Sequence, residues 1–256
     1  MIVVATVGTT HPLAFAGLVF AALAIAADDA RPACVVAGVT AQDAARVTAR
    51  TPLPATAIAA QFEALSDANV RAFHVGALLS AESVDAVAAG LRRYPGVPVV
   101  VDPVLAATHG DTLADDATRD AIFDALLPRA TLFTPNLNEA SAFLQRPIET
   151  VVDMREAARA FVDRGASAAL IKGGHLVGAP TDVLATRDTI AELASPRVDG
   201  SLRGTGDLLA ATIATSLARG ASLDRAIHRA RERVRRAIET GVPFASTRVA
   251  RFSVPG

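Results

Sequence analysis

The sequence has little cysteine and few aromatic residues. Cys34 is the only cysteine among 256 residues, and the chain has one Tyr and no Trp. A single cysteine forms no intrachain disulfide and has no partner for a cysteine-rich metal site. We therefore exclude a disulfide scaffold and expect a protein of the reducing cytoplasm.

An excess of charge of either sign is also missing. The formal net charge is −1, and charged residues make up 20% of the chain. Nucleic-acid binders usually show a basic excess or a basic stripe. The one basic run, HRARERVRRAIE, includes two glutamates and spaces its arginines around a helix, so we interpret it as a solvated helix face. We predict no nucleic-acid partner.

No segment has the features of a membrane anchor or a signal peptide. The apolar run at 13–27 is shorter than the roughly 20 residues that a membrane span needs. No positive charge precedes it, whereas a signal peptide carries one there. We predict a buried first helix over this run and no membrane partner.

What the sequence does contain is an alternation of strand-like and helix-like segments. VPVVVDP is a wholly apolar strand of the kind buried in a parallel sheet, and similar strands are separated by helical patterns. TDVLATRD and TIAELASP predict a hairpin that turns at Arg187 and Asp188. Because no linker or composition break interrupts the pattern, we expect a single domain over 1–256. Its fold class is α/β, a mostly parallel sheet with helices on both faces.

Polar motifs follow several of these strands. Asp102 ends VPVVVDP, Asn136 and Glu139 follow ATLFTP, and Lys172 follows SAALI. In parallel sheets, ligands bind beyond the carboxyl ends of the strands. Each motif also has an ordinary structural explanation, such as a strand end for Asp102, a capping box for Asn136 and Glu139, or a turn at Lys172.

A fourth motif opens a late helix predicted over 204–219. Gly204, Thr205, Gly206 and Asp207 precede a run of small apolar residues. The first N–H groups of a helix lack partners and, with the helix dipole, attract anions, while glycine lets a bulky anion approach. Asp207 could serve the dipole alone. With the acids and lysine above, however, the set supplies what phosphoryl transfer needs.

These motifs give the sequence a family resemblance. VTAQDA, VPVVVDPVLAATHGDTLADDA, LLPRATLFTPNLNEA, IKGGH and GTGDLLAATIATSLARG occur in family order over roughly 35–240. The chain resembles the hydroxymethylpyrimidine/phosphomethylpyrimidine kinases of thiamine biosynthesis. Those kinases belong to the ribokinase-like superfamily, which also holds the pyridoxal kinases. The resemblance implies a ribokinase-like three-layer α/β/α sandwich.

The resemblance also implies roles for the residues. The backbone of Gly204, Thr205 and Gly206 would form an anion hole, and Asp207 would act as the catalytic base. ATP phosphates would contact Lys172 and Thr205, with Asn136 and Glu139 also at the nucleotide site. Asp102 and Glu139 would hold Mg²⁺, and Gln42 would bind the pyrimidine edge.

The sequence departs from the family on the substrate side. The family's first strand usually leads into Ser-Asp and then Gly-Gly-Ala-Gly, where this chain has VGTTHPLAFAG. His11 stands there, either as a substrate-binding residue or as a helix N-terminal residue before Pro12. The late motif begins with Arg203 and ends in Asp207, where thiamine-type kinases usually have His and Cys. We expect a monophosphate acceptor to fit poorly unless Arg203 meets it.

The sequence therefore predicts an ATP- and Mg²⁺-dependent kinase of a small hydroxymethyl heteroaromatic. Hydroxymethylpyrimidine or its phosphate is the first candidate, and a pyridoxal-type vitamin B6 is the second. A non-catalytic paralogue that binds nucleotide or pyrimidine is a rival, motivated by the altered N-terminal loop. The acceptor itself and a homodimer are left open.

Overall fold

The computed structural model describes residues 1–174, 176, 179–244 and 247–252. His175, the last residue of the IKGGH motif, lies outside the described residues. The centre of the molecule is a nine-stranded sheet in the order β3-β2-β1-β4-β5-β6-β7-β8-β9. Its strands are β1 (Val3–Thr10), β2 (Arg31–Gln42), β3 (Val47–Pro52), β4 (Val70–Val75), β5 (Val99–Val101), β6 (Leu132–Phe133), β7 (Ala168–Ile171), β8 (Thr181–Thr186) and β9 (Ile190–Ala194).

The sheet is mostly parallel, as the sequence predicted. Strands β2, β1, β4, β5, β6 and β7 pair in parallel, and β3, β8 and β9 are antiparallel. The predicted hairpin at Arg187 and Asp188 is present as β8 and β9. The sequence analysis missed β3, whose side chains are nearly all exposed, so it carries little apolar signal. It also missed a small hairpin of β10 (Val242–Phe244) and β11 (Thr247–Val249).

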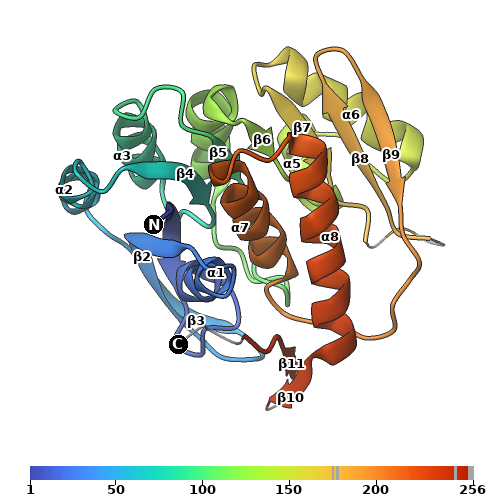
Figure 1. Ribbon diagram of the computed structural model, residues 1–256, viewed down its shortest axis with the longest axis horizontal. Coiled ribbons are helices and arrows are strands. Elements are labelled where there is room, and N and C mark those ends of the chain that lie inside the picture. The colour runs from blue at the N-terminus through green and yellow to red at the C-terminus, as the bar shows by residue number, and fades with distance from the viewer. Residues whose placement is uncertain (175, 177–178, 245–246, 253–256) are drawn as a thin grey trace.

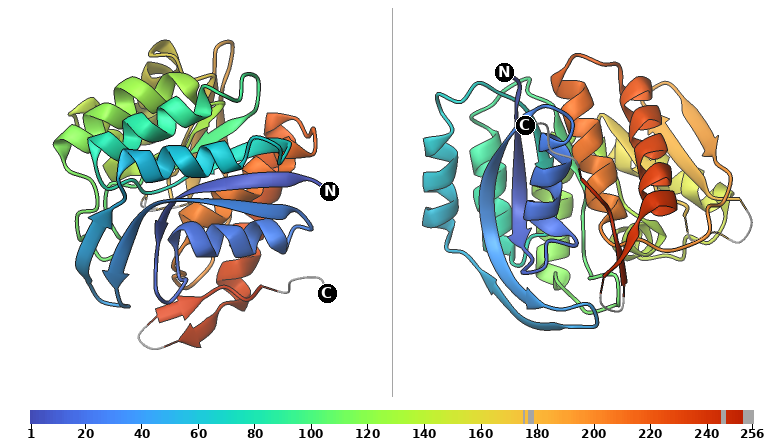
Figure 2. Two further views of the ribbon diagram at one scale, coloured as in Figure 1. Left: turned by 90° about the vertical axis from the view of Figure 1, so that its left-hand side faces the viewer. Right: turned by 60° about the horizontal axis from the view of Figure 1, so that its bottom comes forward.

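Helices cover both faces of the sheet. They are α1 (Gly17–Ala26), α2 (Ala55–Ala64), α3 (Ala81–Leu91), α4 (Asp116–Ala121), α5 (Leu137–Leu144), α6 (Val151–Asp163), α7 (Thr205–Ala218) and α8 (Leu223–Thr240). Figure 1 shows α7 and α8 side by side, and both views of Figure 2 show α1 and α2 on opposite sides of β1 and β2. The three layers match the predicted α/β/α sandwich.

Two apolar clusters hold these layers together. One includes Phe62, Phe73 and Phe161, under α2, α3 and α6. The other includes Phe20 and Ile213, under α1, α7 and α8. All five side chains are buried, and each contributes about 1.5–3 kcal/mol on transfer from water. The sheet edge that carries the polar motifs is therefore mounted on a rigid, two-sided core.

The first helix is shorter than predicted. The sequence predicted a helix over 13–27, whereas α1 spans Gly17–Ala26. Gly17 has a φ of +72°, and a Cβ there would lie 2.7 Å from the carbonyl oxygen of Thr9. The four residues before it are apolar, but the chain must turn after β1 before the helix can begin. This turn positions the loop that faces α7.

The membrane prediction was tested against the helices. Within the described ranges, no helix combines the length and apolar character needed to cross a membrane. The apolar α1 has ten residues and packs its buried face against α7 and β1. Its hydrophobicity therefore serves the core.

Candidate active site

Asp102 and Lys172 come together at the carboxyl edge of the sheet. Asp102 follows β5 and Lys172 follows β7, and Lys172 Nζ donates to Asp102 Oδ1 at 2.5 Å. Thr134 Oγ1 also donates to Asp102 Oδ1, at 3.2 Å. The side chain of Asp102 is 2% exposed and that of Lys172 is 17% exposed. Both hydrogen bonds reach the same oxygen, so Asp102 Oδ2 is left for another partner.

Glu139 joins this pair from the start of α5. Its Oε2 lies 4.0 Å from Lys172 Nζ. Asn136 and Glu139 form a capping box: Glu139 Oε2 accepts from the Asn136 backbone N–H at 2.7 Å, and Asn136 Oδ1 accepts from the Glu139 backbone N–H at 2.9 Å. The structural explanation weighed for these two residues is therefore correct. It also brings the Glu139 carboxylate to the Lys172 ammonium.

The start of α7 passes directly over the Asp102–Lys172 pair. A Cβ on Gly206 would lie 2.9 Å from Asp102 Oδ2 and 3.4 Å from Lys172 Nζ. Gly204 is the N-cap, with a φ of +76°, and no side chain caps the helix there. Gly204, Thr205 and Gly206 are all half-buried. The first turn of α7 therefore offers backbone N–H groups next to the paired charges, as an anion hole requires.

Asp207 is buried in this same turn. Its Oδ2 accepts a hydrogen bond from the backbone N–H of Gly17 at 2.9 Å. Burial, followed by the negative charge of Asp102, raises the pKa of Asp207 to about 7. The sequence analysis missed Gly17 because it read the surrounding run as continuous helix, although a glycine in that run was a visible signal for a helix start. Gly17 fixes the orientation of the Asp207 carboxylate.

The site contains more carboxylates than cationic groups. Burial, and then Asp102 and Asp207, raise the pKa of Glu139 to about 7 against the opposing effect of Lys172. Burial alone would lower the pKa of Lys172, but the acids around it raise it. Three carboxylates thus surround one ammonium, an arrangement that an added cation would stabilise.

The donor set fits Mg²⁺ in particular. Mg²⁺ takes oxygen ligands, usually one or two carboxylates together with substrate phosphates and waters. Asp102 and Glu139 supply two carboxylates at the edge of the anion-binding turn. Among the described residues, no group of three or more His, Cys, Asp or Glu is arranged to hold a metal ion by itself. A two-carboxylate site shared with phosphates is what these residues could form.

His74 is a site neighbour that the sequence analysis missed. It lies in β4, is 1% exposed and places Nδ1 3.0 Å from Thr6 Oγ1. A Cβ on Gly76 would lie 3.5 Å from both His74 Cε1 and Asp207 Oδ1, so the ring and the carboxylate flank Gly76. Burial lowers the pKa of His74 to about 4, which keeps the ring neutral. The signal was a histidine in an otherwise apolar stretch of strand.

Gln42 is the last residue of β2, and His11 directly follows the neighbouring strand β1. Gln42 Nε2 donates to Thr40 Oγ1 at 2.9 Å, and Thr40 Oγ1 donates to the carbonyl oxygen of Thr10 at 2.6 Å. His11 is 2% exposed, and its ring lies 5.4 Å from that of Phe15. Since α1 begins at Gly17, His11 is not at a helix N-terminus, so that explanation was wrong. Roles in substrate binding stay predictions for both residues.

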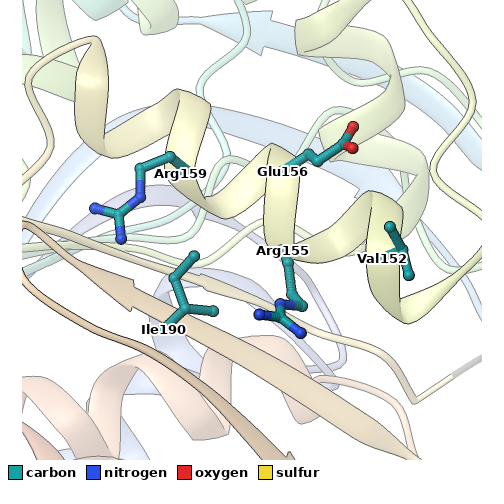
Figure 3. Close-up of a pocket in the computed structure, with 5 residues that line it drawn as sticks. All are labelled: Val152, Arg155, Glu156, Arg159 and Ile190. Atoms are coloured by element: carbon teal, nitrogen blue, oxygen red, sulfur yellow. The ribbon is translucent and has the colours of Figure 1, made fainter.

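Surface depressions lie apart from these residues. Figure 3 shows one between α6 and β9, lined by Val152, Arg155, Glu156, Arg159 and Ile190. None of these five is a candidate site residue. We therefore place the candidate active site at the carboxyl edge of the sheet, where the charged groups converge.

Comparisons with known proteins agree with this geometry. The family model described as phosphomethylpyrimidine kinase matches residues 16–250. The hydroxymethylpyrimidine/phosphomethylpyrimidine kinase of Streptomyces coelicolor is 39% identical over 82% of this chain and 78% of its own length. The protein of the same name from Rhizobium meliloti is 39% identical over 80% of this chain and 79% of its own length.

Solved structures show the same fold. The phosphomethylpyrimidine kinase of Clostridium difficile 630 matches with a TM-score of 0.83 and 26% identity, over 93% of this chain and 100% of its own. The pyridoxal kinase of Bacillus subtilis matches with a TM-score of 0.91 and 26% identity, over 99% of this chain and 98% of its own. The fold is therefore ribokinase-like, as predicted. From the matched family model and these relatives, the chain belongs to the phosphomethylpyrimidine kinase family of phosphotransferases.

Proposed function

We propose that the protein transfers a phosphoryl group from ATP to hydroxymethylpyrimidine, or to its monophosphate, in thiamine biosynthesis. The observation that carries the proposal is the placement of Asp207. This buried carboxylate stands in the anion-binding first turn of α7, held by Gly17 and next to the Asp102–Lys172 pair. A base, a cation and backbone donors thus meet where an acceptor and a phosphate would have to meet.

Each residue of the site has a defined task in this reaction. With hydroxymethylpyrimidine as acceptor, Asp207 orients the hydroxyl and takes its proton as the phosphoryl group transfers. The monophosphate attacks through a phosphate oxygen, which in the dianion carries no proton for Asp207 to remove. Because such transition states are loose, little proton transfer is needed early, and orientation is the larger part of this role. The N–H groups of Gly204, Thr205 and Gly206 receive the transferring phosphoryl oxygens. Lys172 contacts the ATP phosphates and neutralises their charge.

Two further groups complete the nucleotide end. Asp102 and Glu139 are the residues that would hold Mg²⁺, which neutralises phosphate charge when bound. Asn136 shapes this end by capping α5 and holding the Glu139 backbone. Support for ATP as the donor comes from the Bacillus subtilis pyridoxal kinase, which was solved as an ADP complex.

The alternative acceptor, pyridoxal, has weaker support. The backbone is very similar to that of the pyridoxal kinases, but the curated relatives at 39% identity are both named for the pyrimidine substrates. A non-catalytic paralogue is disfavoured because the chain retains Asp207, Lys172 and the glycine turn together. ATP-dependent ADP release with each acceptor tests the proposal. We expect turnover of at least one pyrimidine to exceed that of pyridoxal, and the reverse order would overturn the assignment.

A further inference from the structure

Arg231 of α8 donates to three acceptors in and after the hairpin of β8 and β9. Its Nε donates to Asp182 Oδ2 at 2.8 Å, and its Nη2 donates to Ser195 Oγ at 2.7 Å and to the carbonyl oxygen of Leu193. The side chains of Arg231 and Asp182 are both 16% exposed. Figure 1 shows α8 beside this hairpin. Because charge-assisted hydrogen bonds are strong and directional, the guanidinium fixes the orientation of the Asp182 carboxylate.

Asp182 in turn holds the residue that follows Lys172. Its other oxygen, Oδ1, accepts a hydrogen bond from the backbone N–H of Gly173 at 2.9 Å. Gly173 is buried, and a Cβ there would lie 1.9 Å from the carbonyl oxygen of Thr181, so only glycine allows this close approach to β8. One carboxylate therefore joins the guanidinium of α8 to a backbone peptide at the edge of the candidate active site.

The backbone of Lys172 is held on both sides by these contacts. Its own N–H donates to the carbonyl oxygen of Pro135 at 2.9 Å, and the next N–H, that of Gly173, is the one bound by Asp182. With both flanking peptides fixed, the Lys172 side chain leaves the backbone in one direction. Its Nζ lies 3.4 Å from where a Cβ on Gly206 would stand, in the first turn of α7. A small rotation of the Gly173 peptide would displace this ammonium.

We propose that Arg231 and Asp182 are positioning residues for ATP, which hold the Gly173 peptide so that the Lys172 ammonium meets the phosphates. The inference rests on the proposed function, because it takes Lys172 to contact the ATP phosphates. Misplacing a positioned group by about 1 Å can cost a large factor in binding or rate. The proposed acceptor residues stand on other elements, Asp207 on α7 and Gln42 on β2. Loss of the network should therefore weaken ATP binding and leave acceptor binding intact.

Calorimetric titration with MgATP, in the absence of acceptor, tests the network directly. Asp182→Asn keeps the shape of the side chain, but an amide has one acceptor oxygen for two donors, so the bond to Gly173 or to Arg231 is lost. We expect the Kd for MgATP to rise by about 10- to 100-fold, the range for residues that orient metal ligands from behind. Arg231→Gln should act in the same direction, and Arg231→Lys, which keeps the charge beside Asp182, should restore part of the affinity. The Kd for hydroxymethylpyrimidine, titrated separately, should stay at its wild-type value.

A double-mutant cycle shows whether the effect passes through Lys172. If Asp182 acts by placing the Lys172 ammonium, Asp182→Asn should change the Kd for MgATP much less in a Lys172→Gln background, because the group that it positions is gone. The same fold-change in both backgrounds would overturn the inference. If the double variant is too unstable to titrate, the comparison of MgATP with hydroxymethylpyrimidine in Asp182→Asn decides alone.

Arg233→Gln is the matched control for Arg231→Gln. Arg233 lies on the same helix, is 20% exposed and likewise binds a carboxylate, a hydroxyl and a carbonyl: Asp28 at 2.7 Å, Thr212 Oγ1 at 3.0 Å and the Ala24 oxygen at 3.0 Å. Its variant should lower the melting temperature and leave the Kd for MgATP unchanged. If both variants weakened MgATP equally, Arg231 would only brace α8, and the inference would be overturned.

The remaining outcomes separate the inference from the proposed function. An unchanged Kd for MgATP in Asp182→Asn, or an equal loss of affinity for both ligands, overturns the positioning role even if the wild type phosphorylates a pyrimidine. A wild type that binds MgATP, loses that affinity in Asp182→Asn and phosphorylates neither pyrimidine supports the positioning role and contradicts the proposed function. A wild type that does not bind MgATP overturns both.

Discussion

At the scale of single residues, Asp207 carries the proposed chemistry. Its carboxylate is buried, is oriented by the Gly17 N–H and lies next to Gly76, as the neutral ring of His74 also does. Asp207→Asn keeps the shape of the side chain and removes the base. We expect turnover of hydroxymethylpyrimidine to fall by about 10²-fold or more with a modest change in ATP affinity, the range for removing a general base. Steady-state kinetics check this, and unchanged turnover would refute the assignment.

Asp28→Asn provides a comparison for Asp207→Asn. Asp28 is also a buried acid, with a side chain 7% exposed, but it pairs with Arg229 and Arg233 of α8. Its substitution should lower stability and leave turnover per folded molecule intact. If turnover falls in Asp207→Asn but not in Asp28→Asn, the fall reflects the chemical step and not a loss of stability.

The raised pKa of Asp207 predicts how activity depends on pH. Because the carboxylate loses its proton near pH 7 in the free protein, kcat/KM for MgATP should rise as the pH increases through about 7. Glu139 titrates in the same range, so the acid limb belongs to the pair. Glu139→Gln should retain a limb from Asp207. The limits of the range from pH 6 to 8 each lie about one pH unit from that pKa. A value of kcat/KM that stayed constant across this range would therefore contradict the role of the buried carboxylate.

The same pKa predicts an opposite trend in stability. Between the ordinary pKa of 3.8 and about 7, the folded protein holds a proton on Asp207 that the unfolded chain has released. The contribution of this group to the free energy of unfolding therefore falls as the pH rises through that window and is constant above it. Comparing denaturant unfolding of the wild type and Asp207→Asn across the window isolates it. The free energy of unfolding of the wild type minus that of the variant should therefore fall as the pH rises through this window.

At the scale of elements, the start of α5 combines two roles in one side chain. Glu139 caps the helix through Oε2 and contributes a carboxylate to the site. Glu139→Gln keeps an oxygen for the cap and removes the charge, so we expect a higher Mg²⁺ requirement with a nearly unchanged melting temperature. Asn136→Ala removes the cap and should cost about 1 kcal/mol of stability. Titrating activity with Mg²⁺ and measuring the melting temperature separate the metal role from the capping role. A Glu139→Gln variant that lost stability without needing more Mg²⁺ would show that Glu139 acts only as a cap.

The long α8 shows how an arginine-rich face is used. The sequence predicted a solvated face, and Arg235 and Arg236 pair with Glu232 on the surface of the helix. Arg231, however, is 16% exposed and pairs with Asp182, which also accepts from the Gly173 backbone N–H beside Lys172. The interpretation was therefore right for part of the helix and wrong for the face that packs inward.

Asp28 tests the inward attachment of α8. It joins the turn after α1 to Arg229 at 2.9 Å and Arg233 at 2.7 Å. We expect Asp28→Asn to reduce the free energy of unfolding by about 2 kcal/mol, because a buried hydrogen bond to a charged group is lost. Denaturant melts measure this. A change below a few tenths of a kcal/mol would mean that α8 is held by its apolar contacts alone.

At the scale of the whole molecule, we propose that residues 1–256 form one domain. All nine strands of the central sheet are joined by hydrogen bonds between neighbours, from β3 at one edge to β9 at the other. The two apolar clusters lie on its two faces and draw residues from both halves of the chain. We expect a single unfolding transition by calorimetry. Two resolved transitions would divide the chain and overturn this proposal.

The sequence by itself determined most of the element types, the mostly parallel sheet and the edge at which polar residues gather. These follow from local periodicity and from the rule that strand ends meet, which is why Asp102, Glu139 and Lys172 could be placed together. Only the tertiary structure decided that Gly17 starts α1 and holds Asp207, from 190 positions away. It also decided that His74 and Asp207 both lie next to Gly76 and that the charge of Arg203 acts on His11. Such contacts depend on how distant segments pack, and burial, which sets their charges, exists only once the chain has folded.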